Sequence, residues 1–258
     1  MKKIVLLTLI AFSLTQLYGQ NSSMSSGQNA KEDRNFRIPL IGEKAPSFTA
    51  ETTNGELNFP SDFGKKWKIL FSHPQDFTPV CSTEILELAH LQGELDNLGI
   101  KIAVLSTDPL ETHEQWKKSL ETLNLDNQGT VKIKFPLIAD DNIRIAKMYG
   151  MIHPETNSTR SVRGVFIIDP NNVIQAIYFY PMNIGRNTAE ILRTVEALET
   201  SAKNSTASSH VMTPVNWSPG KDLLVNIPPK AQSSKTSTDV PSGYYSPAWY
   251  LWYKKASQ

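Results

Sequence analysis

Two nearly continuous apolar runs, at residues 68–72 and 101–106, constrain the fold of this chain more than any other feature. Unbroken apolar runs of this kind are typical of strands that are buried on both faces of a sheet. Between them, apolar residues recur at helical spacing until Gly99 interrupts the pattern. We therefore predict a β-α-β unit with a parallel pair of strands.

The only cysteine, Cys81, lies where the first strand passes into this helix. Thr78 suits the N-cap position, and Pro79 suits the first helical position, where a missing N–H costs nothing. Cys81 would then lie in the first turn, facing unpaired backbone N–H groups and the positive end of the helix dipole. That setting favours the thiolate, so we interpret this segment as a reactive centre. The alternative is that Cys81 is a small buried hydrophobic residue.

The rest of the chain alternates between helical and strand-like patterns. Two of the strands are joined by a tight turn and should form an antiparallel hairpin. The predicted helices lie at residues 111–123, 140–150 and 187–199, and the predicted strands at 135–139, 163–169 and 173–180. This order predicts an α/β fold with one mixed sheet and helices on both faces.

The N-terminal residues have the pattern of a targeting segment. In residues 1–19, Lys2 and Lys3 precede an apolar stretch, and Gly19 is suited to cleavage, as in a secretory signal peptide. The stretch is shorter than the roughly 20 apolar residues that a membrane span needs, so we expect no stable span after cleavage. Residues 20–36 are polar and are predicted to be a disordered leader. We therefore expect export to the periplasm or another extracytoplasmic compartment.

Charge and cysteine content exclude several classes of function. The chain has 26 basic and 25 acidic residues, and its net charge of +1 argues against nucleic acid as the main partner. A single cysteine excludes an intramolecular disulfide and a CxxC redox pair. The five histidines are scattered without metal-ligand spacing, so we predict no metal and no other cofactor.

The composition changes near residue 202. Residues 203–209 read as a polar linker, and the segment after them is rich in Pro, Trp and Tyr. We predict a main domain at 37–202 and a smaller C-terminal extension at 203–258. The aromatic side chains of the extension are expected to pack against the main domain or a partner subunit.

Several motifs resemble the peroxiredoxin family. Pro74-x-x-x-Thr78-x-x-Cys81 matches its active-site motif, and the longer stretch at 71–81 is similar to the one-cysteine, peroxiredoxin-6 type. Further matches follow in the order of that subfamily at residues 149–154, 162–163, 180–181, 185–187 and 213–217. The resemblance begins near Ile38 and extends to the C-terminus. It implies a thioredoxin-like fold with a C-terminal extension, and reduction of hydrogen peroxide and organic hydroperoxides by thiols.

The resemblance also implies catalytic roles for four residues. Cys81, as the thiolate, attacks the peroxide. Arg163 supplies fixed N–H donors to the sulfur and to the peroxide, where negative charge grows. Thr78 holds the peroxide through its hydroxyl group, and Pro74 shields the sulfur from water.

Three further residues have supporting roles by the same resemblance, and each has a structural alternative. Glu84 orients the arginine, or is an ordinary first-turn acid of the helix. His73 hydrogen-bonds the sulfur, or is a satisfied polar residue at a strand end. Arg186 is a second, outer arginine of the site, or a structural residue before a helix.

No second cysteine can resolve the sulfenic acid that the attack leaves on Cys81. A thiol–disulfide oxidoreductase on the same fold would need such a cysteine and is disfavoured. The resemblance thus implies a one-cysteine cycle, an external small-molecule or protein thiol as reductant, and a homodimer. The alternative function is a non-catalytic redox sensor or a holdase-type interaction protein on the same fold.

Overall fold

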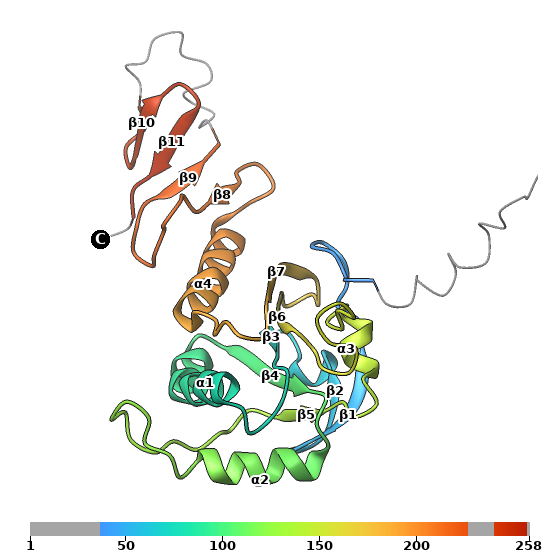
Figure 1. Cartoon of the computed structure of the whole chain (residues 1–258). Coiled ribbons are helices and arrows are strands. Elements are labelled where there is room, and N and C mark those ends of the chain that lie inside the picture. The colour runs from blue at the N-terminus through green and yellow to red at the C-terminus, as the bar shows by residue number, and fades with distance from the viewer. Residues whose placement is uncertain (1–36, 227–239, 257–258) are drawn as a thin grey trace, which may run out of the picture. The chain divides into compact units, whose positions relative to one another are not determined.

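The predicted β-α-β unit is confirmed. In the computed structural model, which describes residues 37–226 and 240–256, β3 (Trp67–Ser72) leads through α1 (Pro79–Asn97) to β4 (Ile100–Ser106). β3 and β4 pair in parallel at the centre of a seven-stranded sheet (Figure 1). The strand order of that sheet is β2-β1-β5-β4-β3-β6-β7.

The elements after β4 keep the predicted alternation, with shifted ends, whereas those before β3 were not predicted. The remaining elements around this sheet are, in chain order, β1 (Phe48–Thr52), β2 (Gly55–Phe59), the 3-10 helix η2 (Ser61–Phe63), α2 (Leu110–Leu120), β5 (Leu137–Ala139), α3 (Arg144–Met148), β6 (Arg163–Ile168), β7 (Ile174–Tyr180) and α4 (Thr188–Asn204). β6 pairs antiparallel with both β7 and β3, so the predicted hairpin is confirmed and the sheet is mixed.

The central strands are buried on both faces because alternate side chains enter two separate apolar clusters. Ile69 and Phe71 of β3 pack in the cluster that takes side chains from α1, α2 and α4. Leu70, between them, packs in the cluster that includes Ile145 and Ala146 of α3. Helices therefore cover both faces of the sheet, as predicted.

One local prediction for the main sheet needs correction. The sequence suggested only loop and turn across residues 38–61, whereas β1 and β2 form an antiparallel hairpin at the edge of the sheet. Phe48, Leu57 and Phe59 point inward from this hairpin while their neighbours are more exposed. Strands this short give only a weak alternation in the sequence.

The predicted boundary at 202/203 falls inside the last turn of α4, which runs to Asn204. The polar linker expected from Lys203 therefore begins later. Lys203 pairs with Glu199, one turn earlier, at 2.8 Å between Nζ and Oε1. Such pairs support the exposed face of a helix, so polar composition alone did not mark its end.

A four-stranded antiparallel sheet follows α4, in the order β10-β11-β9-β8. Its strands are β8 (Val211–Met212), β9 (Leu223–Val225), β10 (Tyr244–Ala248) and β11 (Leu251–Lys254). Val211, Val225 and Trp252 form its small core. Trp249 and Tyr250 are 80% and 68% exposed. Trp252 thus packs in the core of the extension itself, and the expected packing of the aromatic side chains against the main domain or a partner subunit stays a prediction.

The predicted signal peptide at 1–19 and leader at 20–36 lie outside the described residues. Within the part of the chain that the structure describes, no helix combines the length and the apolar character needed to cross a bilayer.

The backbone of Gly164 in β6 lies close to the side chains of Met151 and Phe179. A Cβ at this position would lie 2.8 Å from Met151 Sδ and 3.2 Å from Phe179 Cε1. We expect Gly164→Ala to lower the free energy of unfolding by about 1–3 kcal/mol, because the buried Met151 and the partly buried Phe179 must both shift to admit the Cβ. Urea unfolding measures this. The matched control is Gly93→Ala in α1, where a Cβ meets nothing within 4 Å. The free energy of unfolding of this control should rise by about 0.5–1 kcal/mol. Equal effects of the two changes would contradict the argument.

Candidate active site

Cys81 lies in the first turn of α1, with Thr78 as N-cap and Pro79 as the first helical residue, as predicted. The Thr78 side chain does not cap the helix; its hydroxyl donates to the Gln75 carbonyl at 2.8 Å. The thiol is fully buried and belongs to the apolar cluster beneath α1. Yet Arg163 Nη1 lies 3.4 Å from its sulfur, so Sγ is in contact with a positive charge.

Arg163 is the first residue of β6. It is held by Glu84, which lies one turn after Cys81 in α1. Arg163 Nη1 donates to Glu84 Oε2 at 2.7 Å. Its Nε and Nη2 donate to the Met182 carbonyl at 2.9 and 2.5 Å. The guanidinium is therefore fixed on two sides, with Nη1 shared between the carboxylate and the sulfur.

Arg186 binds the same carboxylate from the other side. Its backbone N and Nε donate to Glu84 Oε1, each at 2.8 Å, and its Nη2 donates to Oε2 at 2.7 Å. Its Nη1 reaches the carbonyls of Ser72 and Gly164 at 2.8 and 2.9 Å. The guanidinium carbon also lies 3.3 Å from the centre of the Phe71 ring. Arg186 thus joins the end of β3 to α1 and β6.

The charges of Arg163, Arg186 and Glu84 do not sum to zero unless the Cys81 sulfur is a thiolate. Burial alone would raise the pKa of Glu84, but the hydrogen bonds and charge of Arg186, with the charge of Arg163, hold that pKa below its usual range. Glu84 is therefore ionised at neutral pH. Two guanidinium groups and one carboxylate leave one positive charge uncompensated among side chains at most 3% exposed. A thiolate at Cys81 would complete the balance.

His73 belongs to a second buried network. His73 Nε2 and His113 Nδ1 each lie 2.7 Å from a different oxygen of Asp76. The Asp76 backbone N donates to Asp108, which also accepts from Arg160. The expectation that the histidines are scattered is wrong for His73 and His113, because folding brings them to one carboxylate.

Ligand-type atoms of His73, Asp76 and Asp108 lie within 4.8 Å of one another, which is close enough for a shared cation. In each of the three residues at least one such atom already takes part in the hydrogen bonds of the network. Internal hydrogen bonds thus engage most of these atoms, while His73 Nδ1 has no hydrogen-bond partner among the described residues, and the prediction of no metal stays a prediction.

The structure brings five of the seven candidate residues into one place. Cys81, Arg163, Glu84 and Arg186 form the charged cluster, and Thr78 begins the same helix. The other two candidates, His73 and Pro74, are buried at the start of the loop from β3 to α1.

Sequence reasoning missed two contributors. The Met182 carbonyl that fixes Arg163 is a backbone group and carries no signal in its side chain. His113 shares the helical spacing of Trp116 and Leu120, so its polar character on an apolar face was the one available signal.

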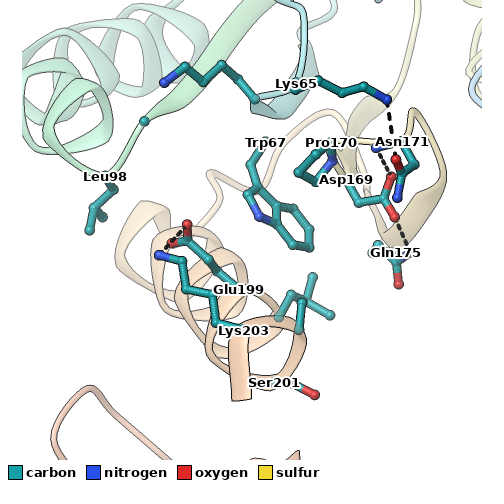
Figure 2. Close-up of a pocket in the computed structure, with 14 residues that line it drawn as sticks. Lys65, Trp67, Leu98, Asp169, Pro170, Asn171, Gln175, Glu199, Ser201 and Lys203 are labelled. Atoms are coloured by element: carbon teal, nitrogen blue, oxygen red, sulfur yellow. Dashed lines mark hydrogen bonds and ion pairs between the residues drawn. The ribbon is translucent and has the colours of Figure 1, made fainter. Parts of the chain in front are cut away.

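A cavity of about 620 Å³ lies elsewhere, at the end of the sheet where β3 and β4 begin (Figure 2). Trp67 and Leu98 supply apolar walls, Lys65 points to Asn171, and Lys203 pairs with Glu199 at its rim. None of the seven candidate residues lines it. The reactive cluster is instead a closed polar site at the other end of β3.

Comparison with known proteins agrees with this geometry. Residues 41–177 match the AhpC/TSA family. A peroxiredoxin of Methanosarcina mazei is 42% identical over 223 residues, which cover 86% of this chain and 100% of that protein. The mitochondrial 1-Cys peroxiredoxin of yeast has 33% sequence identity and a TM-score of 0.72, over 85% of this chain and 100% of that chain. A mutant of peroxiredoxin 6 of Arenicola marina has 31% identity and a TM-score of 0.70, over 85% and 99%.

These similarities extend over most of this chain and nearly the whole of each relative. The expected thioredoxin-like fold with a smaller C-terminal sheet is therefore confirmed. A single cysteine beside a fixed arginine is the one thiol available for peroxide chemistry. The chain therefore belongs to the peroxiredoxin family and is a thiol-dependent peroxidase with one cysteine.

Proposed function

We propose that Cys81 is the residue that peroxide oxidises and that an external thiol restores it in a one-cysteine cycle. The observation that carries this proposal is the 3.4 Å contact between Cys81 Sγ and Arg163 Nη1 in a cluster with one uncompensated positive charge. A thiolate is the nucleophilic form of cysteine, and that charge favours it.

The chemical step follows from this arrangement. A bond forms between Sγ and one peroxide oxygen while the O–O bond breaks. The electron pair of the broken bond leaves on the other oxygen, which takes up a proton and departs as water or alcohol. The sulfur is oxidised to a sulfenic acid and the peroxide is reduced. Arg163, held by Glu84 and the Met182 carbonyl, stabilises the charge that develops on the leaving oxygen.

Thr78 and Pro74 shape the approach of the peroxide in this proposal. The proton of the Thr78 hydroxyl is engaged by the Gln75 carbonyl, so Oγ1 can only accept a further hydrogen bond. We assign it to the O–H group of the hydroperoxide. Pro74 is buried beside this turn and excludes water from the sulfur. Arg186 acts behind Glu84, as a positioning residue.

The reductant must come from outside the chain, because Cys81 is its only cysteine. One thiol condenses with the sulfenic acid and releases water, and a second thiol then reduces the mixed disulfide. The yeast 1-Cys relative is described as resolving its thiol through the glutathione and thioredoxin systems. A thiol of either class is the donor that we propose here.

Two further parts of the proposal concern the oligomeric state and the cellular compartment of the protein. The resemblance to one-cysteine peroxiredoxins supports a homodimer to which the C-terminal extension contributes, and light scattering tests this. The pattern of residues 1–19 alone supports export to the periplasm or another extracytoplasmic compartment, and cell fractionation tests that.

A sulfenic-acid trap tests the central proposal. One equivalent of hydrogen peroxide followed by a dione reagent should label Cys81, and turnover should then follow with glutathione plus glutaredoxin or with thioredoxin. Absence of label with undiminished peroxide consumption would contradict the role of Cys81. Labelling without turnover by any donor, together with a trapped mixed disulfide with a host protein, would favour the redox sensor instead.

A further inference from the structure

The cavity of about 620 Å³ where β3 and β4 begin has no part in the function proposed above (Figure 2). Its volume is within the range of about 300–1,000 Å³ that is typical of small-molecule sites. None of the seven candidate residues of the peroxidase site lines it. A ligand in this cavity would therefore occupy a second site, separate from Cys81.

Apolar side chains form the walls of the cavity. In Figure 2, Trp67 lies between Pro170 on one side and the pair of Glu199 and Lys203 on the other. Two leucines that pack against the apolar cluster of Trp67 complete the walls, at positions 98 and 198. A planar apolar group packs well against a flat indole ring, so these walls favour a ligand with an aromatic ring.

The indole N–H of Trp67 is a hydrogen-bond donor without an acceptor. Its Nε1 can only donate, and it has no hydrogen-bond partner among the described residues. Nε1 is also not one of the atoms that the described protein encloses without a partner, so the cavity gives access to it. The whole residue is only 7% exposed. Polar groups on such buried side chains are normally paired, so this N–H points to an acceptor atom of a ligand.

The lining of the cavity carries more positive than negative charge. Lys65, Lys66 and Lys203 line it together with two carboxylates, Asp169 and Glu199, which leaves an excess of one positive charge. Glu199 is already paired, because its Oε1 lies 2.8 Å from Lys203 Nζ. Asp169 Oδ1 accepts from the backbone N of residues 171 and 173 at 2.7 and 2.9 Å. Both carboxylates therefore have partners of their own.

Lys66 is the cation that is left for a ligand. Its Nζ lies 3.5 Å from the point that a Cβ at Gly99 would occupy, and Gly99 is part of the cavity wall. Among the described residues, Lys66 forms no ion pair. Lys68 is fully buried, and its Nζ donates to the carbonyls of Lys66 and Asp169 at 2.9 and 3.3 Å. Neither ammonium group has a carboxylate partner in the described protein, so both favour an anion nearby.

We propose that this cavity binds an aromatic carboxylate. The ring of the ligand packs against Trp67 and the two leucines, and its carboxylate accepts from Trp67 Nε1 and from Lys66. The carboxylate thereby pairs the free indole donor and offsets the excess positive charge of the lining. The inference does not depend on the function proposed for Cys81, because the two sites share no residue.

Calorimetric titration with 2-naphthoate tests the proposal, and 2-naphthamide is the uncharged probe of similar shape. The whole protein should bind the carboxylate at least about tenfold more tightly than the amide. Lys66→Gln should raise the Kd for 2-naphthoate about threefold to tenfold, and so should Trp67→Phe, which keeps a ring but removes the N–H. Lys66 is exposed, so its variant should fold even if Trp67→Phe does not.

Lys118→Gln is the matched control. It removes one positive charge from an exposed position of α2 that does not line the cavity. Salt screens such a surface charge, so the Kd for 2-naphthoate should stay within about twofold of the wild-type value. Saturating 2-naphthoate should also leave kcat/KM for hydrogen peroxide unchanged.

Three results would overturn the inference. They are no measurable binding of 2-naphthoate, equal affinities for the carboxylate and the amide, and a Kd that Lys66→Gln does not change. Competitive inhibition of peroxide reduction by 2-naphthoate would place the ligand at Cys81 and would overturn it as well. Failure of the proposed peroxidase function would appear differently, as activity that survives replacement of Cys81.

Discussion

Cys81→Ser is expected to abolish thiol-dependent peroxide consumption, with kcat/KM falling at least roughly a thousandfold. A serine hydroxyl is not ionised at neutral pH, so it gives the arginine cluster no anion and the peroxide no strong nucleophile. The side chain is close in size and fully buried, so the fold should remain. Peroxide loss with dithiothreitol as the donor measures the effect.

Ser82→Ala is the matched control for this change. Ser82 is the next residue of the same helical turn, and its hydroxyl donates to the Thr78 carbonyl at 2.8 Å. The control should keep kcat/KM within a few-fold of the wild type. A Cys81→Ser protein that kept more than about a tenth of the activity would mean that another group reacts with peroxide.

Glu84→Gln should have the second largest effect, on stability and on rate together. It leaves Arg163 and Arg186 facing each other with their side chains 3% and 0% exposed. Removing one partner of a buried ion pair leaves the other charge uncompensated. Here two buried guanidinium groups lose the same carboxylate partner. We expect the free energy of unfolding to fall by about 3–5 kcal/mol. Because Nη1 of Arg163 is then no longer held, kcat/KM should fall by at least about tenfold.

The comparison for this variant is Glu190→Gln. Glu190 also pairs with an arginine, Arg193, but these side chains are 42% and 32% exposed. Solvent screens that pair, so its loss should cost no more than about 1 kcal/mol. Urea unfolding and steady-state kinetics separate the two variants. Equal losses would show that the buried position of Glu84 confers no special role.

The local geometry of Cys81 could be predicted from the sequence because its causes are local. Thr78 and Pro79 set the start of the helix, and the apolar run before them sets the end of β3. Arg163 stood out because a charged residue begins an otherwise apolar strand. The two interpretations of Glu84 could not be separated, because an acidic residue near the start of a helix looks the same in the sequence whether it is buried or exposed. The alternative of a first-turn acid is wrong, because Glu84 lies beyond the first turn of α1 and is buried.

The rest depends on which elements become neighbours. His113 lies on α2, and nothing in its own segment indicates that this helix packs beside the end of β3. The Met182 carbonyl belongs to the loop after β7, where any residue offers the same backbone oxygen. Contacts of this kind arise from tertiary packing, whereas a single sequence records periodicity and local caps.

The unbalanced charge at the arginine pair affects what happens when peroxide is in excess. A sulfenic acid is neutral, so the first oxidation of Cys81 removes the anion that Arg163 and Arg186 favour. A further oxidation gives a sulfinate, which is again an anion and which thiols do not reverse. The resting protein and the inactivated protein are thus the two forms that these guanidinium groups hold well. Survival of the enzyme then depends on thiols arriving before a second peroxide molecule does.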